Sequence, residues 1–438
     1  MLARPAAALL CFLGVLGAGC LPTQGTIALD HPEFPTGVAV TADGAHLIVV
    51  SSDFELAVDD GALLSADLAP ARAATPSAAH PIPVVASDYK SSVIIAPLGD
   101  RPVLSPNGDR VYVPTRGDNV IAAVDVQADG SLSCGSSATP QRCGVSPAAL
   151  QLPENDPFTV RMLGEDANNT RVTGFTTLLS SSVITFFSDD KSRAGAARMR
   201  IDTQVDLGTD VAGVRSAVLH HDPTGAAEPT VIAGADLSAL ESLIGARMYL
   251  FRQDAPANFF TFDVTGTTGA LSMRDMVLVP GSDGLEEDAM ITILQPVAST
   301  LSGACCDAIA RFEIRDSSSL PELHLSGLQS TCKSPEQLSY MKQIDRVLLT
   351  CRDDDTIEAL DPRTLIPTDV LRFAGRGPYG LATFEGPAAA AGGAPVEEAY
   401  VSFFEDNSVG LLSFDANQKL TMKARIGAQS EKPEDGRE

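Results

Sequence analysis

The chain of 438 residues contains no tryptophan, and it carries only 31 basic side chains against 56 acidic ones. The lack of tryptophan argues against the Trp-Asp repeat class and against proteins that dock a quinone cofactor on tryptophan motifs. The net charge of −25 argues against nucleic acid or an anionic membrane surface as a partner. An acidic surface of this kind is also a common means of keeping a protein soluble.

Motifs of the common catalytic classes are missing as well. The sequence has no Gly-x-Ser-x-Gly nucleophile elbow, no phosphate-binding loop and no dinucleotide fingerprint. Its six histidines show no metal-ligand spacing, and the one adjacent pair, His220 and His221, would point to opposite faces of a strand. The sequence therefore indicates no catalytic site by motif.

Residues 1–20 have the layout of a secretory signal. One basic residue, Arg4, precedes an apolar core at residues 6–16, and small residues stand directly before Cys20. Small residues before a cysteine resemble a bacterial lipobox, although the aliphatic residue usual three positions earlier is missing. We expect lipidation of Cys20 and export to the bacterial cell envelope, with this anchor as the only membrane contact. A signal cleaved nearby, with Cys20 as an ordinary thiol, and an uncleaved anchor are the alternatives.

Export to an oxidising compartment also accounts for the other cysteines, because six remain beyond the signal segment, an even number. Cys134 and Cys143 bracket a Gly/Ser/Thr/Pro loop and are predicted to pair. Adjacent Cys305 and Cys306 cannot bridge each other without strain. Each is therefore expected to reach Cys332 or Cys351, in an order that the sequence leaves open. Zinc at these four residues is the competing interpretation, but the spacing that zinc prefers is absent.

The residues that are present form a repeat. Ser105–Asp125 has an Asn-Gly turn, a short apolar strand, a charged turn and a second strand. Thr41–Val49 matches the start of this stretch without a gap, 64 positions earlier, and Arg346–Asp361 matches its later part. No single copy can bury its apolar face alone, so the copies must stack.

Seven such units can be placed, at a mean spacing of roughly 57 residues, each a run of short strands bounded by turn residues. This spacing fits an all-β ring of four-stranded blades over residues 31–428, a β-propeller. A linker at 21–30, with a candidate closing strand at residues 27–29, precedes it, and a charged tail at 429–438 is expected to be disordered. A closed array of this kind accounts for the chain length as well as two average domains would. The units are 35–68, 88–132, 156–207, 212–264, 274–314, 338–371 and 379–426.

Four segments carry a resemblance to a known family, namely Pro35–Val40, Ser105–Val113, Asp118–Ile121 and Pro378–Ala382. They resemble the bacterial YVTN-type seven-bladed β-propeller repeat, with its Pro-x-Gly entry, Asp/Asn-Gly turn and Asp-Asn-x-Ile second turn. The match is found in units one, two, six and seven, and units three to five depart from it. The resemblance implies the propeller fold and little about function, since this scaffold serves both binding and catalytic roles.

Repetition places equivalent turns on one face of such a ring. The turn after the repeat strand is rich in acidic and amide side chains, and like charges gathered on one rim favour a bound cation such as Ca²⁺ or a basic ligand. The alternative is that Asp and Asn occupy these turns because they tolerate turn geometry and cap backbone groups. The rim residues are Asp53, Asp118, Asn119, Asp354, Asp355, Asp406 and Asn407.

The sequence thus predicts a lipid-anchored, non-enzymatic propeller that binds a protein, peptide or saccharide at this rim. The alternative is an exported hydrolase or lactonase with a metal-assisted site in the central channel. Such an enzyme requires a cluster of carboxylates with arginine or histidine at the channel mouth. A structural spacer of the envelope is a third interpretation.

Overall fold

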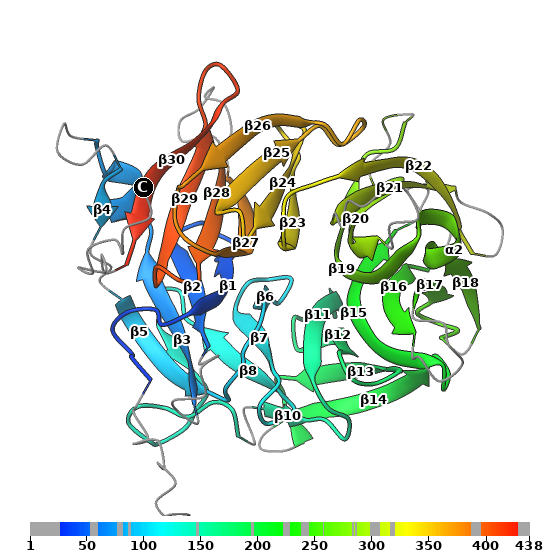
Figure 1. Ribbon diagram of the computed structural model, residues 1–438. Helices are drawn as coiled ribbons and strands as arrows, with labels where there is room; N and C mark the ends of the chain where they lie inside the picture. The colour runs from blue at the N-terminus through cyan, green and yellow to red at the C-terminus, as the bar shows by residue number, and fades with distance from the viewer. Residues whose placement is uncertain are drawn as a thin grey trace, which may run out of the picture.

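The described part of the chain forms seven sheets arranged in a ring, a β-propeller in which the only helices are α1 (Ala69–Ala73) and α2 (Val264–Thr268) (Figure 1). The computed structural model describes residues 27–52, 60–76, 82–85, 89–145, 149–193, 197–221, 228–237, 245–256, 258–282, 284, 287–297, 307–315, 320–386 and 396–427. Neither helix is long and apolar enough to cross a bilayer. The predicted propeller fold is confirmed.

In the first three blades the strand numbers increase from the channel outwards. Blade 1 contains β1 (Pro35–Val40), β2 (His46–Ser51), β3 (Gly61–Asp67) and β5 (Tyr89–Ile95). Blade 2 contains β6 (Val103–Leu104), β7 (Arg110–Thr115), β8 (Val120–Val126) and β10 (Ala149–Gln151), with β9 (Leu132–Ser133) also on β8. Blade 3 contains β11 (Pro157–Glu165), β12 (Arg171–Leu178), β13 (Val183–Asp190) and β14 (Met199–Asp206).

The other four blades follow the same order. Blade 4 contains β15 (Val211–His220), β16 (Thr230–Leu237), β17 (Gly245–Arg252) and β18 (Phe259–Asp263). Blade 5 contains β19 (Ala270–Val279), β20 (Ala289–Val297), β21 (Ala308–Arg315) and β22 (Glu322–Ser330). Blade 6 contains β23 (Pro335–Met341), β24 (Arg346–Cys351), β25 (Thr356–Leu360) and β26 (Pro367–Arg372). Blade 7 contains β27 (Pro378–Gly386), β28 (Val396–Phe403), β29 (Ser408–Phe414) and β30 (Leu420–Ile426), and β4 (Val84–Val85) extends it.

The turn that opens the repeat has one geometry in blades 1 and 2. Gly44 and Gly108 have φ of 70° and 77°, a conformation that glycine adopts without steric cost. Their N–H groups donate to the carbonyls of Thr41 and Ser105, both at 2.8 Å. The hydroxyls of Thr41 and Ser105 accept from the first residue of the following strand, at 3.0 and 3.1 Å. The matching sequences thus form matching turns.

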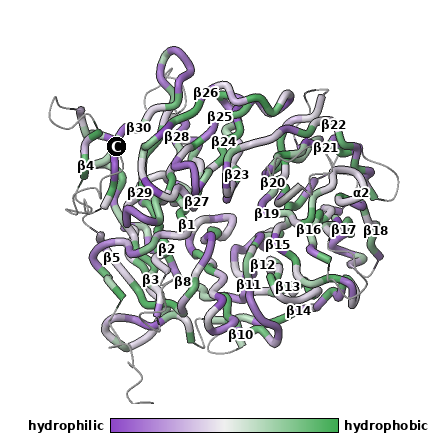
Figure 2. Tube along the Cα trace, viewed as in Figure 1, coloured by the Kyte–Doolittle hydropathy of each residue, from purple (hydrophilic) through white to green (hydrophobic). Residues whose placement is uncertain are grey.

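The hydrophobic core is divided among the interfaces between neighbouring blades. One cluster joins Ile48 and Val50 of blade 1 to Val111 and Val113 of blade 2, and similar clusters follow around the ring. Figure 2 shows hydrophobic segments distributed around the whole ring instead of gathered in one centre. Each sheet therefore buries its apolar faces against the sheets beside it, as stacked repeats must.

Contacts from the β3–β5 connection close the ring. This connection leaves blade 1, and its strand β4 pairs in parallel with β30 at the outer edge of blade 7 (Figure 1). Arg72 of α1 donates to Glu398 at 2.9 Å and to the Tyr400 hydroxyl at 3.1 Å, both on β28. The first and last blades are thus joined by side chains and by a strand.

Two unit boundaries predicted from the sequence are wrong, and residues 27–30 of the predicted linker form no strand. The second unit was expected to begin at residue 88, but Tyr89–Ile95 forms β5, the outermost strand of blade 1, paired with β3. The long connection to β4 separates β5 from the rest of its blade along the chain. Blade 5 also extends past the expected end at 314, because β22 adds its outermost strand.

Candidate functional site

Asn119, Asp355 and Asn407 occupy equivalent positions in the turn between the second and third strands of blades 2, 6 and 7. All three have a left-handed backbone, with φ of 55°, 52° and 52°. Each side-chain oxygen accepts a hydrogen bond from the backbone N–H of the residue before the next blade's first strand. The donors are Asp156 at 3.1 Å, Gly377 at 2.8 Å and Phe34 at 2.9 Å, respectively.

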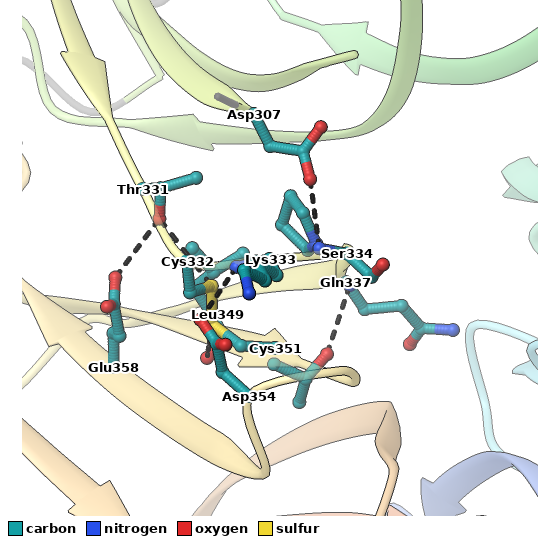
Figure 3. Close-up of a disulfide and its surroundings, with 12 residues drawn as sticks. Asp307, Thr331, Cys332, Lys333, Ser334, Gln337, Leu349, Cys351, Asp354 and Glu358 are labelled. Atoms are coloured by element: carbon teal, nitrogen blue, oxygen red, sulfur yellow. Dashed lines mark hydrogen bonds between the residues drawn. A yellow bond between two sulfur atoms is a disulfide. The ribbon is translucent and has the colours of Figure 1, made fainter. Parts of the chain in front are cut away.

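Asp307 makes the same connection from blade 5 to blade 6, where its Oδ2 accepts from the Ser334 N–H at 2.9 Å (Figure 3). All four donor residues have a positive φ and are followed by proline. Because proline has no N–H, the residue before it supplies the last donor at the blade entry. We call these four bonds the Asx caps. The recurring X-Pro at a blade entry is their sequence signal.

Three further acidic members of the predicted rim, Asp118, Asp354 and Asp406, lie in the same turns and therefore on the same face of the ring. Asp53 lies outside the described residues. Carboxylate oxygens of two of them already have protein partners. These partners are the Lys333 N–H for Asp354, at 2.9 Å, and Arg376 and Arg425 for Asp406, at 2.9 and 3.2 Å. Binding of Ca²⁺ or of a basic ligand by this rim stays a prediction.

The innermost strands enclose a pocket at the end of the channel that carries these turns. This channel pocket, together with its open mouth, has about 380 Å³ of space outside protein atoms. Five of the seven blades contribute to it, through β11, β19, β23, β27 and the segment just before β6, all of which lie near the ring centre (Figure 1). Its lining residues are Asp100, Arg101, Phe158, Thr159, Val160, Arg161, Arg274, Asp275, Glu336, Gln337 and Tyr379.

Bulges in the innermost strands bring these residues into the channel. The pairing register shifts between Pro157 and Val160, Met273 and Met276, Pro335 and Leu338, and Pro378 and Leu381. In each case an interval of three residues on the inner strand pairs with an interval of two residues on the neighbouring strand. An extra residue of this kind locally breaks the alternation of side chains and re-aims them. The lining residues of blades 3, 5, 6 and 7 lie at these bulges.

Hydroxyl groups on the second strand satisfy the amides that the bulges release. Thr350 accepts from the Gln337 N–H at 3.1 Å, and Ser402 accepts from the Gly380 N–H at 2.7 Å. In blade 3, Thr177 accepts from the Thr159 N–H at 3.3 Å. Because a buried N–H without a partner is costly, these hydroxyls allow the bulges to persist.

Asp275 is shared by two arginines of the pocket. Its carboxylate lies 3.3 Å from Arg101 and 3.9 Å from Arg161, and it accepts from the Leu338 N–H at 2.8 Å. Burial, and then the charge of Arg101, lower the pKa of Arg161 to about 10. The two guanidinium groups therefore crowd one carboxylate.

Glu336 and Arg274 form a second centre. They pair directly, and Arg352, which lies in the same rim turn as Asp354, also contacts Glu336, at 3.2 Å. Arg274 donates to the Tyr379 hydroxyl at 3.0 Å, and its guanidinium lies 5.9 Å from the ring centroids of both Phe158 and Tyr379. Burial raises the pKa of Glu336, which its two arginines oppose. The rim and the channel pocket are thus connected through Arg352.

Asp100 has no such partner. It is 3% exposed, and its Oδ1 accepts from the Arg101 N–H at 2.8 Å. Among the described residues, no cation lies within ion-pair distance of it and its Oδ2 has no hydrogen-bond partner. Burial raises the pKa of Asp100 above the ordinary value of 3.8. Neither Asp100 nor any other lining residue was identified from the sequence, although Phe158, Glu336 and Tyr379 each directly follow the proline that opens a blade.

The cysteines are partly as predicted. Cys134 and Cys143 form the expected disulfide. The prediction that Cys332 and Cys351 pair with Cys305 and Cys306 is wrong, because Cys332 and Cys351 pair with each other (Figure 3). The reason is the local strand pairing. Strands β23 and β24 are antiparallel, with Pro335 opposite Cys351, so Cys332 lies near Cys351 and their Cα atoms are 5.8 Å apart. Cys20, Cys305 and Cys306 lie outside the described residues.

The described residues contain one group with metal-ligand geometry, formed by Cys332, Cys351 and Glu358. Two of its three members form the disulfide, and the third accepts from the Thr331 hydroxyl at 3.1 Å (Figure 3). This group does not line the channel pocket.

Comparisons with known proteins give structural neighbours only. No protein-family model and no curated protein matches the sequence. Among solved structures, hydrazine synthase of Kuenenia stuttgartiensis is 13% identical with a TM-score of 0.55, over 89% of this chain and 97% of that chain. The periplasmic gluconolactonase of Pseudomonas aeruginosa is 14% identical with a TM-score of 0.51, over 77% and 84%.

The β-propeller domain of Cps50 (Swd1) from Myceliophteria thermophila is 10% identical with a TM-score of 0.53, over 88% and 97%. These comparisons show the fold. At such low identity, the different roles in the neighbours' names do not transfer to this propeller.

Proposed function

We propose that this propeller is an exported, lipid-anchored binding protein whose ligand site is the channel pocket. The observation that carries the proposal is the gathering of charged and aromatic side chains from five blades at one mouth of the channel. Charged groups in a partly closed site lose hydration, and a ligand that supplies polar partners recovers part of that free energy. The signal-like segment before Cys20 and the two disulfides support export.

The bulges support a binding role because they hold the lining residues before any ligand arrives. The bulges of blades 3, 6 and 7 are each fixed by a hydroxyl of the neighbouring strand, and the entries of blades 1, 3, 6 and 7 are each fixed by an Asx cap. A rigid, pre-formed site loses less entropy on binding than a flexible one. The ligand enters from the face that carries the rim turns.

The missing tryptophan permits a direct test of this proposal. Phe158→Trp places a single tryptophan in the channel pocket, beside Arg274. Phe259→Trp places it on the outer strand β18, as a matched control. We expect some members of a panel of saccharides, sugar acids, amino acids and short peptides to change the emission of the first variant only. A panel that changes neither emission, or both equally, would contradict the proposal.

A hydrolase is the second candidate, because three carboxyl groups and three arginines line the same pocket. A buried carboxyl group with a raised pKa, as at Asp100, suits general acid catalysis. The gluconolactonase neighbour makes δ-gluconolactone a reasonable probe. Hydrolysis by the native protein, with or without added divalent metal, that is lost in Asp100→Asn would favour this candidate over the binding role.

A further inference from the structure

The arginines at the Asp275 side of the channel pocket exceed their carboxylate partners. Arg101 and Arg161 both approach Asp275, and within the described ranges neither has another carboxylate within 4.0 Å. The other paired acid of the pocket, Glu336, is already engaged by Arg274 and Arg352. One guanidinium of the Asp275 pair therefore lacks a full counter-charge.

Arg161 lines the pocket, and only part of its guanidinium is engaged in hydrogen bonds. Its Nε donates to the Ala217 carbonyl at 3.0 Å, and a terminal nitrogen donates to the Val160 carbonyl at 3.3 Å. The other terminal nitrogen is the one 3.9 Å from Asp275, too far for a hydrogen bond. The two carbonyls fix the plane of the group while 20% of the side chain stays exposed. The other N–H groups of Arg161 have no hydrogen-bond partner among the described residues, and a planar guanidinium can donate in parallel to the two oxygens of a carboxylate.

Asp100 adds a second requirement. Its Oδ2 lies buried in the lining of the same pocket without a hydrogen-bond partner among the described residues. A purely anionic ligand would meet repulsion or an unmet acceptor there, whereas a hydroxyl group can donate to this oxygen. The pocket therefore favours a ligand with a negative group at one side and a neutral hydrogen-bond donor at the other.

We propose that the ligand of the channel pocket is a small hydroxycarboxylate, with its carboxylate on Arg161 and Arg101 and its hydroxyl on Asp100. This inference rests on the proposed binding function and specifies the class of ligand. A single negative charge matches the one uncompensated guanidinium. A dianionic phosphate would exceed that charge and would bring more negative charge toward Asp100.

Four small probes test the class by their effect on the emission of Phe158→Trp. Glycolate has both groups, acetate has the carboxylate alone, glycolamide is the neutral counterpart, and inorganic phosphate is the competing oxyanion. We expect glycolate to bind best, acetate several-fold more weakly, and glycolamide at least about tenfold more weakly. Equal binding of glycolate and glycolamide, or tighter binding of phosphate, would overturn the hydroxycarboxylate assignment.

Variants in the same reporter background locate the two contacts. We expect Arg161→Met to weaken glycolate and acetate about tenfold, Arg161→Lys to restore part of the loss, and neither to affect glycolamide. Asp100→Asn is expected to reduce the preference for glycolate over acetate. Arg200→Gln, on the outer strand β14 where the side chain is 46% exposed, is the control and should change nothing. Loss of affinity for all probes alike in Arg161→Met would contradict a specific carboxylate contact.

The outcomes separate this inference from the proposed function. If other panel compounds change the reporter in the channel pocket but the carboxylates do not, the ligand class is wrong and the binding function stands. If no compound of any class changes it, both are wrong.

Discussion

The side chain of Asn407 accepts a hydrogen bond from the backbone N–H of Phe34 at 2.9 Å, across 373 positions of sequence. This Asx cap joins the last blade to the first, and the same bond joins three other pairs of neighbouring blades. The same local hydrogen bond thus joins neighbouring blades within the ring and also joins the last blade to the first.

Loss of this cap should destabilise the ring. We expect Asn407→Ala to lower the free energy of unfolding by about 1–3 kcal/mol, because the Phe34 N–H loses its acceptor and alanine tolerates the left-handed backbone poorly. Asn407→Asp should cost much less, since Asp355 fills the equivalent position. Urea denaturation measures both, with Asn417→Ala on an exposed turn as the control. Equal losses in the alanine and aspartate variants would contradict the role of the side-chain oxygen.

Arg72 and Glu398 should be coupled in the same closure. The Glu398 side chain is 3% exposed, so Arg72→Met leaves a buried carboxylate with fewer partners. We expect a loss of about 1–3 kcal/mol. Glu398→Gln in the Arg72→Met background should recover part of it, because the amide can still bond the Tyr400 hydroxyl. A double-mutant cycle measures the coupling, and additive effects would show that the pair does not hold the blades together.

Disulfide mapping should find Cys134 linked to Cys143 and Cys332 linked to Cys351. We expect replacement of both Cys332 and Cys351 by alanine to lower the free energy of unfolding by about 2–4 kcal/mol. Mass spectrometry of the non-reduced digest and urea denaturation check the two parts. A peptide that links Cys332 or Cys351 to Cys305 or Cys306 would contradict the observed pairing.

The stability of the native protein should depend on the protonation of Asp100. Its raised pKa means that the folded chain holds this proton more tightly than the unfolded chain. The contribution of Asp100 to stability therefore falls as the pH rises from the ordinary value of 3.8 through the folded pKa. Asp100→Asn lacks this dependence, so its stability relative to the native protein should increase across that window and then level off. Urea denaturation at a series of pH values measures the difference, and a constant difference would contradict the raised pKa.

The fold could be predicted from the sequence because the turn residues of the repeat recur in recognisable positions. Gly44 and Gly108 are required by backbone conformation, and their matched surroundings identify the repeat directly. The blade boundaries were harder to predict. Tyr89–Ile95 belongs to blade 1 but follows a connection whose strand β4 pairs with blade 7. Composition gives no indication of such a detour.

The channel pocket was not predicted because the types of its residues differ from blade to blade, even where Phe158, Glu336 and Tyr379 share one position after the entry proline. Arg274 and Asp275 are adjacent in a strand, where alternation would place them on opposite faces, yet the bulge between Met273 and Met276 allows both to line the pocket. The rim turns were found from sequence because they repeat. Three of their side chains, Asn119, Asp355 and Asn407, form Asx caps, which agrees with the alternative that Asx residues stand there to cap backbone groups.

Thr350 offers the sharpest test of how the scaffold positions the pocket. Its hydroxyl accepts from the Gln337 N–H at 3.1 Å and donates to the Tyr379 carbonyl at 2.9 Å, so one atom fixes the bulges of blades 6 and 7. Thr350→Val keeps the shape but leaves two buried backbone groups without partners. We expect a loss of about 1–3 kcal/mol in the free energy of unfolding and weaker glycolate binding, because Gln337 and Tyr379 both line the pocket.

The matched control is Thr350→Ser, which retains the hydroxyl and should preserve both properties. Urea denaturation and the emission of the Phe158→Trp background measure the two effects on the same protein. If Thr350→Val lowers stability while glycolate binds as before, the hydroxyl supports the blade but does not position the channel pocket. If Thr350→Ser loses as much as Thr350→Val, side-chain packing accounts for the effect instead of the two hydrogen bonds.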